Sequence, residues 1–214
     1  MIAHRTRIKI CGIRDAAMAR FAADAGADAI GLVFHAPSPR AVDPDAARAI
    51  AEAVPAFVTV VGLFVNRDAQ AVREVLARVP LGMLQFHGDE SAAFCDQFGL
   101  PWIRAVGVGP GVDLVEYEAR FSRAAALLLD AQAPGRFGGT GIAFDWSLVP
   151  PTLARPVILS GGLDAGNVGR AIHAVGPWAV DVSSGVEAKR GVKDAARIEE
   201  FVRSVKDADA RAGG

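Results

Sequence analysis

Two titratable side chains each close an apolar run of the chain, at Cys11 and at Asp130. Cys11 ends the short β-branched run Ile8–Cys11 and is followed at once by Gly12, while Asp130 ends the apolar run 124–129. Both groups can accept or donate a proton in catalysis. A carboxyl group after a run apolar enough to be buried is hard to explain by packing. A lone cysteine is most often an inert core residue, so Cys11 becomes a candidate only in combination with Asp130 and the other candidate residues.

Composition narrows the classes of partner. Lys and Arg number 23 against 24 Asp and Glu, giving a formal charge of -1, and nothing in this balance suggests nucleic acid or an anionic membrane. No apolar run approaches membrane-spanning length. Cys11 and Cys95 form neither a disulfide framework nor a metal-binding spacing. We therefore expect a cytoplasmic protein without a metal site. We expect a monomer, with a homodimer as the alternative.

The chain alternates expected strands with expected helices. Short apolar runs predict strands at 8–11, 29–34, 57–64, 83–86, 102–106, 126–129, 157–159 and 179–182. Capping residues and helical spacing predict helices at 16–24, from 44, and at 67–79, 91–98, 113–120, 167–174 and 193–205, with a helical turn near 144–146. We expect the tail 207–214 to be frayed.

Eight strand–helix units in 214 residues, about 27 residues each, predict a (β/α)₈ TIM barrel as a single domain over residues 1–214. The strands are continuous apolar runs, as in parallel sheets covered on both faces. A doubly wound open sheet is the alternative. Against it, the first turn, Cys11-Gly12-Ile13-Arg14, lacks the Gly-x-Gly-x-x-Gly of a dinucleotide site.

In such a barrel the groups at the carboxyl ends of the strands share one mouth, where active sites are built. This rule selects Cys11, His35, Arg40, Asn66, His87, Asp130, Ser160 and Asp181. Small residues also follow the last two strands, with Gly161 and Gly162 after the seventh and Ser183, Ser184 and Gly185 after the eighth. Backbone amides exposed there bind anions, so the sequence favours a phosphorylated ligand over ordinary turn chemistry.

Six motifs, in order along nearly the whole chain, resemble those of the phosphoribosylanthranilate isomerase family. They are Lys9-Ile10-Cys11-Gly12-Ile13, Gln85-Phe86-His87-Gly88, Leu128-Leu129-Asp130, Gly138-Gly139-Thr140-Gly141 with Phe144-Asp145-Trp146, Leu159-Ser160-Gly161-Gly162-Leu163, and Asp181-Val182-Ser183-Ser184-Gly185-Val186-Glu187. Any one glycine-rich piece would be weak evidence, whereas the ordered set is specific.

The resemblance implies an Amadori rearrangement of a phosphosugar, N-(5′-phosphoribosyl)anthranilate, in tryptophan biosynthesis. It implies Cys11 as general base and Asp130 as general acid, with no metal or redox cofactor because both steps are proton transfers. It also implies that Arg40 grips the anthranilate carboxylate. Asp181 is expected near the ribose or the substrate nitrogen, with a structural role as the alternative. His87 is expected to line the aromatic end of the pocket.

The expected protonation states pose a problem, because free thiols titrate near ~8.5 and free aspartates near ~3.9. Desolvation after an apolar run would raise the pKa of Asp130. Lys9, on the same strand face as Cys11, is a candidate to stabilise a thiolate, with an ordinary salt-bridged lysine as the alternative. A second possibility is that Cys11 loses its proton only once substrate is bound.

The sequence leaves three alternative functions to consider. A related isomerase of an imidazole nucleotide uses two aspartates, and Cys11 stands where one of them would be expected. Indoleglycerol-phosphate synthase would need catalytic lysine and glutamate at strand ends. A non-catalytic phosphosugar-binding barrel is the alternative from another class. The glycine-rich segment 135–141 is expected to act as a lid.

Overall fold

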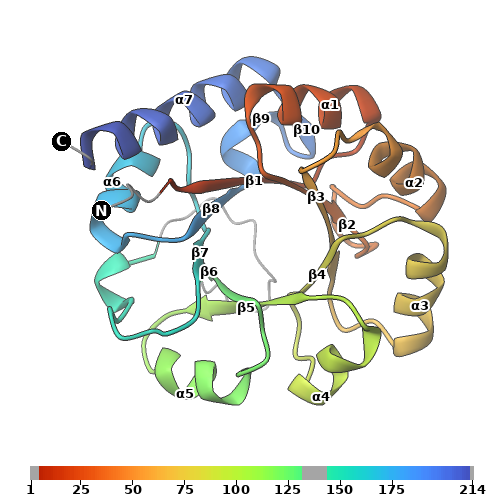
Figure 1. Ribbon diagram of the computed structural model, residues 1–214, viewed down its shortest axis with the longest axis horizontal. Helices are drawn as coiled ribbons and strands as arrows, with labels where there is room; N and C mark the ends of the chain where they lie inside the picture. The colour runs from red at the N-terminus through yellow and green to blue at the C-terminus, as the bar shows by residue number, and fades with distance from the viewer. Residues whose placement is uncertain (1–4, 132–143, 213–214) are drawn as a thin grey trace.

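A computed structural model describes residues 5–131 and 144–212 and contains eight parallel strands closed into a barrel (Figure 1). The barrel strands are β1 Arg7–Cys11, β2 Ala29–Val33, β3 Thr59–Phe64, β4 Met83–Phe86, β5 Trp102–Val108, β6 Ala126–Ala131, β7 Val157–Leu159 and β8 Ala179–Val182. The helices outside it are α1 Ala16–Ala25, α2 Pro44–Ala53, α3 Ala69–Arg78, α4 Ala92–Cys95, α5 Leu114–Arg120, α6 Val168–Val175 and α7 Ala195–Ala212.

The strands are neighbours in chain order, and β1 pairs in parallel with both β2 and β8. This closure confirms the predicted TIM barrel and excludes the open doubly wound sheet. The register also determines which residues are neighbours at the mouth of the barrel. Lys9 lies opposite Asp181, and Cys11 lies opposite Gly31. Figure 1 shows the helices as an outer ring around the strands, with α7 beside α1.

Local sequence explains where most helices begin. The Asp15 carboxylate accepts a hydrogen bond from the Met18 amide at the start of α1. Asp68 does the same for the Ala71 amide at the start of α3. Such caps satisfy amides that the first helical turn leaves without partners. The predicted helix 91–98 divides into α4 and the 3₁₀ helix η1 Asp96–Phe98, and the turn predicted near 144–146 is η2 Trp146–Leu148.

The structure corrects several predicted boundaries, including the ends of the second and fifth strands and the start of the third helix. The third strand begins at Thr59 rather than Phe57, because Phe57 is fully exposed and has a φ of 72°, outside the β region. β6 continues through Ala131, so Asp130 lies inside the strand. The last helix begins at Ala195 rather than Lys193.

A two-stranded hairpin, absent from the predicted elements, precedes the last helix. The 3₁₀ helix η3 Ser184–Val186 leads into β9 Glu187–Lys189, which pairs antiparallel with β10 Val192–Lys193. The two strands are too short for period-two alternation to be visible in the sequence.

The tail predicted to be frayed is helical as far as Ala212. Ala208 is buried, and the Asp209 carboxylate accepts hydrogen bonds from the Thr6 amide at 2.8 Å and the Thr6 hydroxyl at 2.6 Å. These contacts hold the end of α7 against the start of the first strand. No helix within 5–131 and 144–212 is long and apolar enough to cross a membrane.

The alternation of side chains along the strands determines what enters the barrel. A lower interior layer is apolar and consists of Val61, Ile103, Ala105, Ala126, Leu128, Ile158 and Ala179. Closer to the carboxyl ends the same faces carry Cys11, Gln85, Asp130 and Asp181, all buried or nearly so. The upper interior of the barrel therefore combines these polar groups with an apolar cluster of Cys11, Val33, Leu63 and Val65.

Candidate active site

A cavity of about 350 Å³ opens at the carboxyl ends of the strands. Its volume is in the range of small-molecule sites. It is lined by nearly all of the predicted site residues, namely Cys11, Arg40, His87, Asp130, Gly161, Gly162, Asp181, Ser183 and Ser184. Gly185 does not line it, and Asn66 from the wider shortlist faces Asp89 and Glu90 instead.

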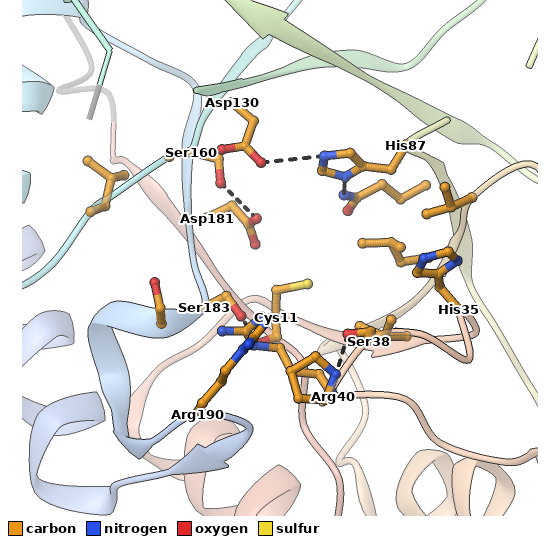
Figure 2. A pocket seen from close by; sticks show the side chains of 18 of the residues that line it. Cys11, His35, Ser38, Arg40, His87, Asp130, Ser160, Asp181, Ser183 and Arg190 are labelled. Carbon is orange, nitrogen blue, oxygen red and sulfur yellow. Dashed lines mark hydrogen bonds and ion pairs between the residues drawn. The ribbon is translucent and has the colours of Figure 1, made fainter. Parts of the chain in front are cut away.

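Cys11 is at the end of β1, with 6% of its surface exposed. Figure 2 shows its sulfur pointing into the space between Asp130, Asp181 and His35. Gly31 of β2 leaves room for it, since a Cβ at Gly31 would lie 2.8 Å from the Cys11 Sγ and 3.1 Å from the Lys9 Nζ. The register of β1 and β2 thus places the thiol and the ammonium over the same glycine.

Lys9 does not interact with Cys11 alone. Its Nζ donates to the Asp181 Oδ1 at 2.7 Å, and both side chains are almost completely buried. The second Asp181 oxygen accepts from the Ser160 hydroxyl at 3.1 Å. Burial lowers the pKa of Lys9, but Asp181 and Cys11 outweigh it, so the pKa is raised and the ammonium stays charged. These contacts fit the structural role that the sequence left as the alternative for Asp181. The side chain of Asp181 also lines the cavity.

The pKa of the Cys11 thiol is raised, first by burial and further by the Asp181 carboxylate. Lys9 and Lys193 act in the opposite direction without overcoming burial. In the free protein the thiol is therefore neutral near pH 7. Of the two routes considered from the sequence, the structure favours loss of the proton after substrate binds.

Asp130 faces His87 across the cavity (Figure 2). Its Oδ2 lies 3.4 Å from the His87 Nε2, and its Oδ1 accepts from the Ala131 amide at 2.8 Å. On the other side of the ring, the Gln85 Nε2 lies 3.0 Å from the His87 Nδ1. His87 therefore contacts the predicted acid directly, which the prediction of an aromatic-lining role did not include.

Arg40 is held by a bidentate ion pair with Glu187. The Arg40 Nε and Nη2 donate to the two Glu187 carboxylate oxygens at 2.7 and 3.0 Å. Lys193 Nζ donates to the same carboxylate at 2.9 Å, and the Gly191 amide at 3.0 Å. Burial raises the pKa of Glu187, but Arg40, Lys193 and the Gly191 amide outweigh it and bring it to about 2.

The Arg40–Glu187–Lys193 cluster is buried and carries two positive charges against one negative. Burying this excess positive charge costs free energy unless another anion compensates it. A negatively charged ligand in the cavity would supply that anion.

The loops after β7 and β8 lie against each other. A Cβ at Gly185 would be 2.0 Å from the Leu163 carbonyl oxygen, so the loops require this glycine. Gly161 and Gly162 have positive φ values of 81° and 63°, a conformation that glycine adopts without strain. Ser183 is tied to the site because its hydroxyl donates to the Cys11 carbonyl oxygen at 3.1 Å and Lys193 Nζ donates to its carbonyl oxygen at 2.9 Å.

Four residues of the site were not among the sequence candidates. Arg190 lines the cavity from the turn of the β9–β10 hairpin. Glu187 and Lys193 hold Arg40 and Ser183, and Gln85 contacts His87. Glu187 and Gln85 lie within the family motifs. Arg40 is 147 positions away from Glu187, whereas His87 is only two positions away from Gln85. Only for Gln85 was there a local signal, a polar residue inside an apolar strand.

Within the described ranges, no group of three His, Cys, Asp or Glu side chains is placed to hold a metal ion. Cys95, the second cysteine, is buried outside the cavity, and burial raises its pKa to about 12. The segment 135–141, expected to act as a lid, lies outside the described residues.

Comparison with known proteins places these features in a family. The family model of N-(5′-phosphoribosyl)anthranilate isomerase matches residues 8–204. An enzyme of that name from Pseudomonas putida strain W619 is 57% identical over 202 residues, covering 94% of this chain and 98% of the relative.

Two solved structures are also similar. A phosphoribosyl anthranilate isomerase in complex with reduced 1-(o-carboxyphenylamino)-1-deoxyribulose 5-phosphate is 39% identical, with a TM-score of 0.83, over 94% of this chain and 99% of that one. The enzyme from Thermotoga maritima is 40% identical, with a TM-score of 0.87 and the same coverage.

Proposed function

This chain belongs to the N-(5′-phosphoribosyl)anthranilate isomerase family, and on that premise we propose that Asp130 is its general acid and Cys11 its general base. The chain thus catalyses the isomerase step of tryptophan biosynthesis that defines the family. The observation that carries the residue assignment is that a buried thiol and a buried carboxyl group, from β1 and β6, line one cavity.

In the first step Asp130 gives a proton to the ring oxygen of the ribose. The bond from C1′ to that oxygen breaks, and the nitrogen lone pair forms an iminium ion with C1′. Because charge develops on the leaving oxygen, a positioned acid lowers the barrier of this step. Asp130 leaves the step as a carboxylate, with the Ala131 amide and His87 as neighbours.

In the second step Cys11 removes the proton from C2′, and the electron pair of that bond neutralises the iminium nitrogen. The resulting enamine tautomerises to the ketose. The iminium cation itself explains how a thiol with a raised pKa becomes a base, since a nearby positive charge stabilises the thiolate. Lys9 and Lys193 act in the same direction.

The remaining assignments follow the charge of the substrate. The anthranilate carboxylate binds Arg40, whose guanidinium is already oriented by Glu187. The phosphate binds between the loops carrying Gly161, Gly162, Ser183 and Ser184. Asp181, which lines the cavity, acts near the ribose or the substrate nitrogen in this proposal. Location in the cytoplasm and a monomeric state stay predictions.

Turnover of chemically generated N-(5′-phosphoribosyl)anthranilate tests the two catalytic roles. Asp130→Asn and Cys11→Ala should each lower kcat by about 10²–10⁴-fold while the fold is retained. Asp15→Asn and Cys95→Ala are matched controls outside the cavity and should keep near-normal kcat. Near-normal kcat in Asp130→Asn would move the acid role to another group, and in Cys11→Ala it would remove the thiol from the mechanism.

The carboxylate assignment has its own test. Arg40→Ala should raise KM for the anthranilate substrate by the equivalent of about 1.5–3 kcal/mol, the range for a hydrogen bond to a charged group. Inhibition by inorganic phosphate should be affected much less, because Arg40 reaches the phosphate loops only indirectly, through Glu187 and Lys193. Equal weakening of both ligands would show that Arg40 acts through the fold instead.

A further inference from the structure

The contacts of His87 do not match what a general acid at Asp130 needs. With the Gln85 amide nitrogen facing Nδ1, that ring nitrogen accepts, and the ring proton is on Nε2 facing Asp130. The Ala131 amide then donates to the Asp130 Oδ1, and the Nε2–H group of His87 lies 3.4 Å from the Asp130 Oδ2. Donors of this kind favour the carboxylate, which has no proton to give.

Gln85 shows a second mismatch. It is 0% exposed, and its Oε1 is buried without a hydrogen-bond partner among the described residues. An unsatisfied buried acceptor costs about 1–3 kcal/mol. Rotating the terminal amide by half a turn exchanges its oxygen and nitrogen, and it places Oε1 against the His87 Nδ1.

One added proton resolves the first mismatch, and rotation of the amide then gives Oε1 a partner. If the His87–Asp130 pair gains a proton, it becomes either imidazolium with carboxylate or neutral imidazole with carboxylic acid. In both forms the shared proton lies between Nε2 and Oδ2, and in both forms Nδ1 carries hydrogen. The buried Nδ1–H then needs an acceptor, and the rotated Gln85 amide supplies its oxygen.

We propose that Gln85 is a positioning residue whose amide rotation allows the His87–Asp130 pair to hold the proton that the general acid delivers. When the pair lacks the added proton, the Gln85 amide donates to Nδ1, as in the structure. When the pair holds that proton, the rotated amide accepts from Nδ1–H. The pair gives one proton to the ring oxygen of the substrate and regains one from solvent. This inference rests on the proposed role of Asp130.

Other charges near His87 are few in the described part of the cavity. Asp130 faces it from β6, and His35 approaches from the loop after β2. Burial, then Arg67 and His87, lower the pKa of His35, so a charge on His87 meets a neutral neighbour near pH 7. His35→Gln is therefore a control in which the pKa of His87 should stay the same or rise.

Nitrogen NMR of the histidine rings tests the proposal without any turnover. In the wild type at high pH, His87 should be the Nε2–H tautomer. Gln85→Met removes the acceptor at similar volume and should lower the pKa of His87 by about one to two units, the equivalent of one hydrogen bond to a charged group. Gln85→Glu, which can only accept, should raise it. His87→Asn identifies the signals.

Kinetics add a second readout. Gln85→Met should lower kcat at neutral pH with little change in KM, because substrate does not need the amide for binding. An unchanged pKa of His87 in Gln85→Met overturns the proposal. So does an Nδ1–H tautomer in the wild type at high pH, a measurement that decides the matter even if the variants do not fold. Near-normal turnover in Asp130→Asn would instead overturn the acid role and leave the NMR result standing.

Discussion

At the scale of single residues, Cys11 shows how surroundings set reactivity. The chain has two cysteines, and both are buried. Cys95 lies outside the cavity, and burial is the largest cause of its raised pKa. Cys11 lines the cavity with Lys9 and Asp181 beside it, and these two charges act in opposite directions on the pKa of the thiol. What distinguishes Cys11 is therefore access to a substrate cation rather than a thiolate formed in advance.

This view predicts the pH dependence of alkylation. Below its pKa the thiol is neutral and unreactive, so the rate of alkylation should rise with pH and reach its midpoint above the ~8.5 of an unperturbed thiol. Rates of Cys11 modification by iodoacetamide would be measured in Cys95→Ala protein, and saturating product analogue should protect. A midpoint below ~8.5 would mean that Lys9 and Lys193 do activate the thiol before substrate arrives.

At the scale of elements, the β9–β10 hairpin holds the rim of the site together. Glu187 begins β9 and binds Arg40 from the loop after β2, while Lys193 ends β10 and binds Ser183 after β8. The hairpin thus connects the proposed carboxylate and phosphate subsites through one buried carboxylate. Breaking a buried ion pair by removing one partner leaves the other charge uncompensated.

Glu187→Gln should lower the free energy of unfolding at pH 7 by about 3–5 kcal/mol. The folded pKa of Glu187, about 2, is below the ~4.3 of an unfolded glutamate. Its contribution is therefore present above about pH 4.3 and is lost as pH falls toward 2. Denaturation at several pH values should show the two proteins converging in acid, with exposed Glu199→Gln as the neutral control. A pH-independent difference would contradict the role of the charge.

At the scale of the whole molecule, the two ends of the barrel have different roles. The cavity is at the carboxyl ends of the strands. At the opposite end Thr6, just before β1, is 2% exposed and bonded to Asp209 near the end of α7. The last helix thus closes the ring against the first strand, far from the proposed chemistry.

Asp209→Ala should reduce the free energy of unfolding by about 1–3 kcal/mol, because the buried Thr6 amide and hydroxyl lose their acceptor. Urea denaturation would show a lower midpoint with the same slope. Turnover by the folded protein should be unaffected. Asp207→Ala, an exposed position two residues away on the same helix, is the control, and an equal loss there would show that helix content rather than the Thr6 contact matters.

The sequence alone determined the barrel, because eight apolar runs separated by capped helices have few other solutions. It also determined that Cys11, His87, Asp130 and Asp181 share one mouth, since parallel strands bring their carboxyl ends together. The family motifs added the proposed roles of Cys11, Asp130 and Arg40. All of these signals are local in the chain and periodic, so they can be read without coordinates.

The partners of these residues were decided by the tertiary structure. The Lys9–Asp181 pair depends on the register of β1 against β8, and the Arg40–Glu187 pair joins residues 147 positions apart. The hairpin and the helical tail also escaped prediction, because their stability comes from remote contacts such as Thr6–Asp209. Protonation depends on burial and on charges that strand pairing brings together. For that reason the sequence could name the thiol, whereas its protonation state followed only from the fold.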